Sequence, residues 1–316
     1  MNICAILPAY KVERHILTVI QQIDALVCRI YVVDDACPNG SGKLVEQQCT
    51  DPRVTVLYNP INLGVGGAVM RGYEAGLADG MDVFAKIDGD GQMDPALLPR
   101  FLKPIVNGHA DYTKGNRFFH LESLVAMPLV RKAGNACLSL VNKFSSGYWD
   151  IMDPTNGYTV IHRKALELLP LGKISNRYFF ESDMLFRLGT IKAVVRDIPM
   201  DAIYADETSS LSIGRTALAF MPLYFKAFCK RFFYTYLLRD FNVASLESIV
   251  GLSLFGFGLV FGIINWQSAA SLDAFASPGT VMLAAVPLIM GFQLLLSAMH
   301  FDINNIPRTP LQEILS

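Results

Sequence analysis

Charged side chains are scarce in this chain: Asp, Glu, Lys and Arg together make up 17% of its 316 residues. The mean hydropathy of +0.34 is high for a soluble enzyme and indicates membrane segments. The formal net charge is −1, so no overall field attracts nucleic acid or an anionic lipid surface. We therefore expect no nucleic-acid partner, and any basic patch must be local.

Cysteine spacing excludes further protein classes. The six cysteines form no CxxC pair and no zinc spacing, so neither a zinc site nor a disulfide framework is expected. Most of them stand in apolar segments, which is typical of reduced thiols in a cytosolic domain. Because an apolar strand pattern begins at once, we also expect no signal peptide.

Short apolar runs alternate with helical patterns in the first part of the chain. We expect strands at 3–7 (ended by Pro8), 30–33, 54–57 and 83–87, and helices at 13–26, around Leu44 and at 68–78. This alternation predicts an α/β fold with a mostly parallel sheet and helices on both faces. Ligands of such sheets bind at the carboxyl ends of the strands, where Pro8, Asp35 and Asp88 fall.

The segment Asp88-Gly89-Asp90-Gly91-Gln92 is the clearest candidate for chemistry. Alternate side chains of an extended strand point the same way, so Asp88, Asp90 and Gln92 would present three oxygen ligands together. Mg²⁺ and Mn²⁺ prefer oxygen ligands and are often shared with substrate phosphates. The alternative is a solvated Asp-Gly turn. The position after an expected strand favours the metal site.

Four motifs follow one another along this region. They are Pro8-Ala9-Tyr10 with Glu13, Val32-Val33-Asp34-Asp35, the glycine-rich segment 59–68, and Asp88-Gly89-Asp90-Gly91-Gln92. In this order they resemble family 2 glycosyltransferases, especially the polyprenyl-phosphate group typified by dolichol-phosphate mannose synthase and including bacterial membrane-anchored hexosyltransferases. The similarity continues through 115–118, 153–158 and 181–183. It implies a GT-A fold, a nucleotide-sugar-binding sheet joined to an acceptor half.

The resemblance also implies roles for individual residues. The base and ribose pocket would be lined by Pro8, Tyr10, Glu13 and Asp35, with Asp88 also at the nucleotide. Mg²⁺ or Mn²⁺ would be held against the sugar diphosphate by Asp88, Asp90 and Gln92. Arg117 would bind a phosphate, for which a guanidinium is suited; a surface arginine is the alternative. The glycine-rich loop resembles a phosphate cradle, but we expect it to serve helix packing near the nucleotide.

Asp153 stands where family members that attack with an alcohol place a general base. A lipid phosphate is already anionic near neutral pH, so we expect Asp153 to position the substrates; a turn carboxylate before Pro154 is the alternative. Arg131 and Asn135 lie four residues apart, on one face of an expected helix, and resemble the family's acceptor-phosphate pair, although serine is more usual at 135. The basic residue expected before Ser209 is replaced by acids, which makes Arg215 a candidate substitute.

The segment 211–240 combines basic residues with aromatics at every fourth position. The aromatics are Phe220, Tyr224, Phe228 and Phe232. Such a stripe predicts amphipathic helices that lie in the membrane interface, broken by Pro222. The alternative is a helix whose aromatic stripe faces a protein core.

Two apolar runs follow, at about 243–264 and 279–300, each long enough to span a membrane. The linker 265–278 contains no Lys or Arg, so the positive-inside rule places both ends of the hairpin in the cytosol. Two buried helices of a soluble protein are the alternative. We therefore expect a cytosolic GT-A catalytic domain at 1–210, interfacial helices at 211–240, and a transmembrane hairpin with a short cytosolic tail at 241–316.

These features predict a metal-dependent, inverting hexosyltransferase of the bacterial inner membrane. It would transfer a hexose from a nucleotide sugar, a UDP-sugar in preference to GDP-mannose, to a polyprenyl phosphate at the cytosolic face, with Asp153, Arg117 and Arg131 at the reaction centre. One rival is a processive or other-lipid-acceptor family 2 enzyme, although neither tryptophan lies in Gln-x-x-Arg-Trp. Another is a non-catalytic membrane scaffold. Whether the protein forms a homo-oligomer stays open.

Overall fold

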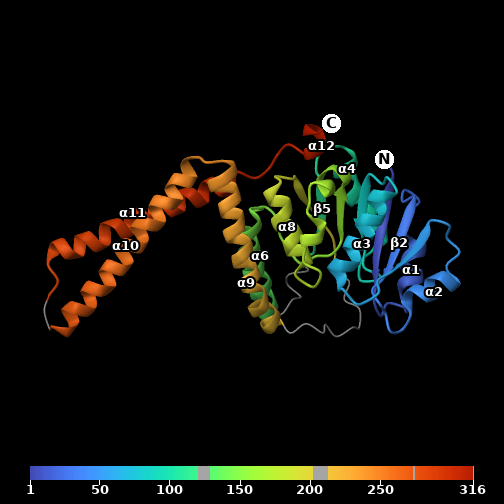
Figure 1. The fold of residues 1–316 in the computed structure, drawn as a ribbon, viewed down its shortest axis with the longest axis horizontal. Helices are drawn as coiled ribbons and strands as arrows, with labels where there is room; N and C mark the ends of the chain where they lie inside the picture. The colour runs from blue at the N-terminus through green and yellow to red at the C-terminus, as the bar shows by residue number, and fades with distance from the viewer. Residues whose placement is uncertain (120–128, 202–212, 273–274, 316) are drawn as a thin grey trace. The chain divides into compact units, whose positions relative to one another are not determined.

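The computed structural model describes residues 1–119, 129–201, 213–272 and 275–315. They form two compact units, which we call the first and second units. The first unit comprises Met1–Phe228 together with Pro307–Ser316, and the second comprises Cys229–Ile306. Figure 1 shows the sheet in the first unit and the long helix pair in the second.

A seven-stranded sheet forms the centre of the first unit, in the order β3-β2-β1-β4-β6-β5-β7. The strands are β1 Ile3–Ala9, β2 Arg29–Asp34, β3 Val54–Tyr58, β4 Val83–Lys86, β5 Tyr112–Asn116, β6 Thr159–His162 and β7 Val195–Pro199. Only β6 among them runs antiparallel to its neighbours β4 and β5. The predicted α/β fold with a mostly parallel sheet is confirmed.

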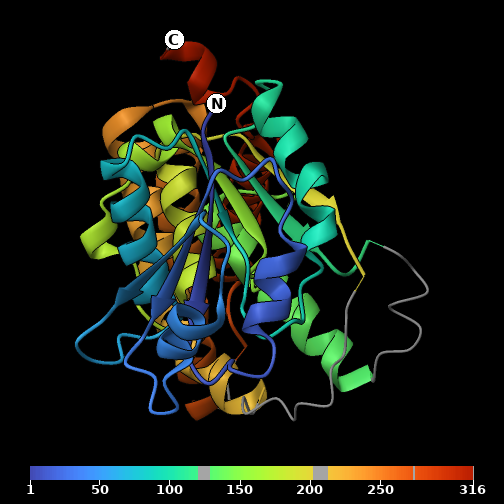
Figure 2. The same cartoon turned by 90° about the vertical axis from the view of Figure 1, so that its right-hand side faces the viewer.

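Helices cover both faces of this sheet (Figure 2). Those of the first unit are α1 Ile16–Gln22, α2 Ser41–Gln48, α3 Val65–Ala78, α4 Leu98–Val106, α6 Leu129–Ser146, α7 Arg163–Glu167, α8 Phe180–Thr190 and α12 Leu311–Ile314, with 3₁₀ turns at Pro95–Leu97 and Leu171–Lys173. Helices α1 and α4 bury Ile16, Ile20 and Phe101 in one core cluster with alternate residues of β1. On the other side, Tyr73 of α3 packs edge-to-face on Phe84 of β4.

Several predicted boundaries are wrong: α1 ends at Gln22 rather than Leu26, and α3 begins at Val65 rather than Ala68. Strand β1 does not end at Pro8 but pairs with β2 as far as Ala9. Its pairing with β4 stops at Ile6, so the N–H that proline lacks is not needed on that side. Helix α1 begins at Ile16 rather than Glu13, because Glu13 lies in a turn where its carboxylate accepts hydrogen bonds from Asn39 (2.6 Å) and Ser41 (3.3 Å).

The end of the chain returns to the first unit. The fully buried carboxylate of Asp111, just before β5, accepts the backbone N–H groups of Val194 (2.8 Å), Leu311 (2.9 Å) and Gln312 (3.2 Å). The Gln312 amide in turn donates to the carbonyls of Ile105 and Ala110. Helix α12 is therefore fastened to the sheet domain although the whole second unit precedes it in sequence.

Helix α9 (Ile213–Phe232) runs through Pro222 without a break, and its aromatic stripe does not face a membrane. The hydroxyl of Tyr224 is hydrogen-bonded to Ser182 of α8 (2.7 Å), and Phe220 and Phe228 pack on Phe179 and Phe144 respectively. The core-facing alternative therefore holds for this stripe. Helix packing on α6 and α8 compensates for the backbone hydrogen bond that proline removes.

The second unit contains the π-helix Phe233–Arg239 and the helices α10 Val243–Ser271 and α11 Pro278–Asn304. Helices α10 and α11 are long and apolar enough to cross a membrane and lie side by side (Figure 1). At one end of the pair, buried Arg231 forms a bidentate ion pair with Asp302 (2.8 and 2.9 Å), and Tyr236 also donates to Asp302. This buried network ties α11 to the segment that precedes α10.

Candidate active site

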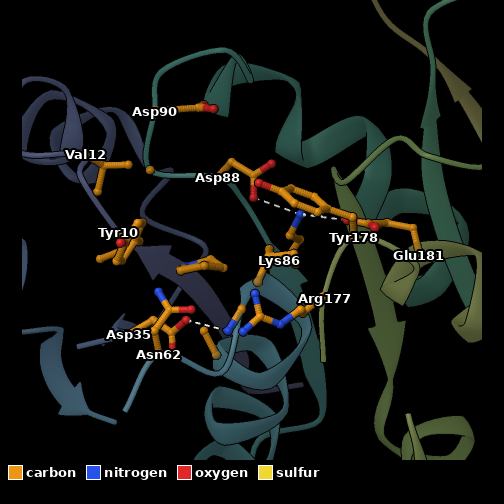
Figure 3. Close-up of a pocket in the computed structure, with 16 residues that line it drawn as sticks. Tyr10, Val12, Asp35, Asn62, Lys86, Asp88, Asp90, Arg177, Tyr178 and Glu181 are labelled. Atoms are coloured by element: carbon orange, nitrogen blue, oxygen red, sulfur yellow. Dashed lines mark hydrogen bonds and ion pairs between the residues drawn. The ribbon is translucent and has the colours of Figure 1, made fainter. Parts of the chain in front are cut away.

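A cavity of about 510 Å³ lies at the carboxyl ends of β1, β2 and β4. Its lining residues are Pro8, Ala9, Tyr10, Val12, Asp35, Asn62, Gly64, Val65, Ala68, Lys86, Asp88, Gly89, Asp90, Arg177, Tyr178 and Glu181. Figure 3 shows that these side chains come from both walls, with Tyr10 and Asp35 facing Arg177 and Glu181. Five of the residues predicted from the sequence (Pro8, Tyr10, Asp35, Asp88 and Asp90) are thus brought together around one cavity.

Asp35 holds the glycine-rich loop in place. Its carboxylate accepts the backbone N–H groups of Leu63 (2.9 Å) and Gly64 (2.7 Å) and the side-chain amide of Asn59 (2.8 Å). Gly64 has φ +92°, a conformation that favours glycine. The loop is therefore held by a carboxylate that itself lines the cavity.

The same loop presses against the segment before α8. A Cβ at Gly66 would lie 2.3 Å from the carbonyl oxygen of Ser175, and the N–H of Gly67 donates to the carbonyl of Asn176 (3.1 Å). The expectation that these glycines serve close packing is confirmed, and their nearness to a nucleotide stays a prediction. This contact also places Arg177 and Tyr178 in the cavity wall.

Lys86, the last residue of β4, brings a buried positive charge to the cavity. Its ammonium lies 2.8 Å from Asp88 Oδ1 and 3.5 Å from Glu181 Oε1. Burial favours the neutral amine, but Asp88 and Glu181 outweigh it and raise the pKa of Lys86. Burial raises the pKa of Glu181, although Lys86 opposes that shift. A cation and two carboxylates therefore share one side of the cavity.

The predicted extended geometry of the Asp88–Gln92 segment is wrong. Strand β4 ends at Lys86, and the chain then turns, with Gly91 at φ +76°. Asp90 Oδ1 accepts the N–H of Gln92 (2.9 Å), and the Gln92 side chain does not line the cavity. Figure 3 shows Asp88 beside Lys86 and Asp90 apart from both. Alternation fails because a left-handed residue reverses the chain.

The residues present fit a divalent cation that is shared with a substrate. Within the described residues, no group of three or more His, Cys, Asp or Glu side chains is placed to hold a metal ion. Two carboxylates, Asp88 and Asp90, nevertheless line the same cavity. Mg²⁺ sites typically use one or two carboxylates and take their other ligands from phosphates and water. A Mg²⁺ or Mn²⁺ ion would therefore be held by these carboxylates together with a bound diphosphate.

Arg117 and Asp153 form a separate pair beyond the end of β5. Arg117 donates from Nε and an Nη to the two carboxylate oxygens, each at 2.7 Å. Asp153 is buried and adopts φ +50°, a strained conformation that Asp tolerates better than most residues. Burial would raise the pKa of Asp153, but the Arg117 guanidinium outweighs it and lowers that pKa. Neither side chain lines the cavity.

The remaining predicted residues divide into two groups. Glu13 does not line the cavity but ties its own turn to Asn39 and Ser41. Asn135 lies on α6, whereas Ser209 and the side chains of Arg131 and Arg215 lie outside the described residues. Their acceptor roles stay predictions.

Sequence reasoning missed the opposite wall of the cavity. Lys86 had a local signal, because a lysine stands at the end of an otherwise apolar strand. Arg177 and Tyr178 lie more than eighty residues further along the chain and carried no such signal. Glu181 belongs to the 181–183 segment that resembles the family, but no role was predicted for it. Their contribution follows from the fold.

The first unit has a GT-A fold. The crystal structure of glucosyl-3-phosphoglycerate synthase from Mycobacterium tuberculosis with UDP has a TM-score of 0.53 at 18% identity, covering 73% of this chain and 79% of that chain. The chain belongs to glycosyl transferase family 2, whose model matches residues 4–169, and it is therefore a glycosyltransferase.

Two relatives in this family are named enzymes that act on lipid phosphates. An undecaprenyl-phosphate mannosyltransferase of Micrococcus luteus is 32% identical over 204 residues, covering 63% of this chain and 83% of the relative. A UDP-N-acetylglucosamine–dolichyl-phosphate N-acetylglucosaminyltransferase of Methanococcus voltae is 26% identical over 215 residues, covering 64% and 85%.

Proposed function

We propose that this enzyme transfers a hexose from a nucleotide sugar to a polyprenyl phosphate. The observation that carries the acceptor class is the state of Asp153. An alcohol acceptor requires a general base, but Asp153 is buried in a bidentate ion pair with Arg117 and its pKa is lowered, which makes it a weak base. A lipid phosphate is already anionic, with a second pKa of about 6. The similarity to the M. luteus enzyme supports the same acceptor.

The donor would occupy the cavity, with its base and ribose against Pro8 and Tyr10 and its diphosphate toward Asp88 and Asp90. A divalent cation held there would neutralise the charge on the leaving diphosphate. We favour a UDP-sugar over GDP-mannose, because the M. voltae relative is named for a UDP-sugar. The M. luteus relative is named a mannosyltransferase, so both donor classes belong in the test.

The acceptor phosphate would attack the anomeric carbon on the side opposite the diphosphate, which inverts the configuration. Arg117 and Arg131 would bind this phosphate. A guanidinium has five N–H donors, of which Asp153 engages two through the side chain of Arg117. The ion pair therefore fixes the orientation of Arg117.

A direct assay tests the proposal. The purified full-length protein is incubated in detergent with undecaprenyl phosphate, Mn²⁺ and, one at a time, radiolabelled UDP-sugars and GDP-mannose. We expect label in the lipid extract with one donor and none when undecaprenol, which lacks the phosphate, replaces the acceptor. Transfer to the alcohol would refute the phosphate acceptor. Polymeric product would favour a processive enzyme, and failure to bind any nucleotide sugar would favour a scaffold.

The fold supports a membrane hairpin with both ends on one side. The tail that follows α11 is fastened to the sheet domain through Asp111 and Gln312, and α10 and α11 are the two helices that could span a membrane in the described chain. A chain that leaves and re-enters the same domain must cross the membrane an even number of times. We therefore propose that the catalytic domain and tail lie at the cytosolic face of the bacterial inner membrane.

Impermeant thiol labelling tests this topology. In a cysteine-free background, Ser271→Cys should react from the non-cytosolic side of intact cells, because Ser271 ends α10 and no Lys or Arg lies between the two helices. Arg308→Cys, in the exposed part of the tail, should react only after the cells are opened. Labelling at 308 in intact cells would contradict the hairpin.

The acceptor proposal makes a prediction at Arg131. A charge-assisted hydrogen bond contributes about 1.5–3 kcal/mol, so Arg131→Ala should weaken the apparent affinity for undecaprenyl phosphate by about ten- to a hundredfold. Donor binding without lipid, measured by calorimetry, should hardly change. Lys132→Ala, the next residue on α6, is the matched control and should leave both affinities near the wild-type values. A loss of donor affinity in Arg131→Ala would move the acceptor site elsewhere, with Arg215 as the next candidate.

A further inference from the structure

The side chain of Lys86 lies beside a carboxylate that would hold a metal ion. Its ammonium is buried, with 1% of the side chain exposed, and lies 2.8 Å from one oxygen of Asp88. The second carboxylate, Glu181, is 3.5 Å away, and 12% of its side chain is exposed. In this arrangement Lys86 already neutralises one of the two carboxylates that would bind the cation.

Three distant sequence motifs build this arrangement. Lys86 ends β4, Glu181 lies in the first turn of α8, and Gly157 belongs to the Asp153–Tyr158 segment. A Cβ at Gly157 would lie 2.2 Å from Lys86 Nζ and 3.0 Å from Asp88 Oδ2. The ammonium therefore fills a space beside Asp88 that only glycine leaves open.

The charge of Lys86 would couple the binding of a divalent cation to the binding of a diphosphate. A divalent cation bound to Asp88 would lie a few ångströms from a fixed positive charge, and charges so close repel strongly at a poorly solvated site. A diphosphate in the cavity would supply negative charge to both cations. Lys86 would then face phosphate oxygen and Glu181, and the carboxylate of Asp88 would be available to the metal.

We propose that Lys86 makes divalent-cation binding at Asp88 depend on the donor's diphosphate. Free metal binds weakly because Lys86 occupies the carboxylate, whereas metal and diphosphate bind cooperatively because the diphosphate draws Lys86 away. Glu181 weakens the competition between Lys86 and the metal, since it pairs with the same ammonium as Asp88. The inference rests on the proposed nucleotide-sugar donor but not on the identity of the acceptor.

A Mn²⁺ titration without nucleotide tests the competition. Binding to the full-length protein is measured from the electron paramagnetic resonance signal of free Mn²⁺. Lys86→Met should bind Mn²⁺ about tenfold more tightly than wild type, because a unit charge is removed near the site. Glu181→Gln should bind Mn²⁺ several-fold more weakly, because Lys86 then loses its second carboxylate partner and pairs only with Asp88. Lys114→Met is the control: that lysine is equally buried and paired with Asp197 at 3.3 Å, but it does not line the cavity.

A second titration with UDP or GDP present measures the coupling. Wild type should bind Mn²⁺ much more tightly with the nucleotide than without it, and Lys86→Met should lose most of that difference. A purely structural lysine would predict that both variants weaken Mn²⁺ binding and keep the nucleotide effect, and this result would overturn the inference. If Lys86→Met does not fold, the nucleotide effect in Glu181→Gln decides. The inference predicts a larger effect than in wild type, because Lys86 then pairs with Asp88 alone, and an unchanged nucleotide effect would overturn it.

The outcomes also separate this inference from the proposed function. If wild type binds Mn²⁺ with UDP or GDP but transfers nothing to undecaprenyl phosphate, the acceptor assignment fails and the Lys86 inference stands. If transfer occurs and Lys86→Met leaves Mn²⁺ binding unchanged, the inference fails alone.

Discussion

Replacing Asp90 by asparagine is expected to lower the rate of sugar transfer at least about a thousandfold while leaving the fold intact. The amide oxygen of asparagine can still accept the N–H of Gln92, as Asp90 Oδ1 does at 2.9 Å, so the turn should survive. The substitution removes one of two carboxylates that would hold the metal at the leaving diphosphate. Electrostatic groups at the point where charge develops are each worth about a hundred- to a thousandfold, and loss of the metal would add to this.

The control lies four residues further along the same loop. Asp94 caps the following 3₁₀ turn by accepting the N–H of Ala96 (2.9 Å) and does not line the cavity, so Asp94→Asn should keep wild-type activity. Rates are measured over a Mn²⁺ titration, with thermal unfolding to confirm the fold. Full activity of Asp90→Asn, or of the wild-type enzyme in excess chelator, would refute the metal assignment.

Local sequence patterns predicted the first four strands and the mostly parallel sheet with helices on both faces, but not strands β5, β6 and β7. Apolar runs and helical spacing succeed as signals because they record which residues are buried. The end of β1 was missed because Pro8 was judged by its missing N–H alone, whereas the strand on that side had already ended. Whether a proline ends a strand depends on whether a neighbouring strand needs its N–H, and the local sequence does not specify that neighbour.

Half of the cavity was predictable from motifs, and the other half was not. Pro8 lies near the end of β1, and Tyr10 and Asp88 follow β1 and β4, so their position at the sheet edge follows from topology. Lys86 and Glu181 are 95 residues apart, and no periodicity links them. The placement of Gln92 failed for a different reason, since one left-handed glycine removes the alternation on which the prediction depended.

The aromatic stripe of α9 shows a limit of amphipathic patterns. A period of four residues establishes that one face of the helix is covered, but it does not distinguish a membrane surface from a protein surface. The bond between Tyr224 and Ser182 identifies the cover as protein. Met221, Leu223 and Phe225, outside the stripe, are exposed, so an interfacial role for the helix would rest on these side chains.

The general-base question leads to the second large effect, at Asp153. Asp153→Asn should lower kcat more than about a hundredfold, because the ion pair that orients Arg117 is lost and misplacing a positioning group costs about that much. Asparagine tolerates the left-handed backbone at this position, so the turn should be kept. The shape of the pH–rate profile should not change, since a residue that only positions does not titrate in the working range.

The sign of the pKa shift supports this expectation. The pKa of Asp153 is lowered in the folded protein from its ordinary value of 3.8, so the stabilisation by the ion pair is complete above that value and is lost as the pH falls through the folded-state pKa. Between pH 5 and 9 the carboxylate stays charged. Measurement of kcat and kcat/KM over that range, with Asp150→Asn at an exposed position as control, decides the role. Disappearance of a limb of the profile in Asp153→Asn would make Asp153 a true base and would favour an alcohol acceptor over a lipid phosphate.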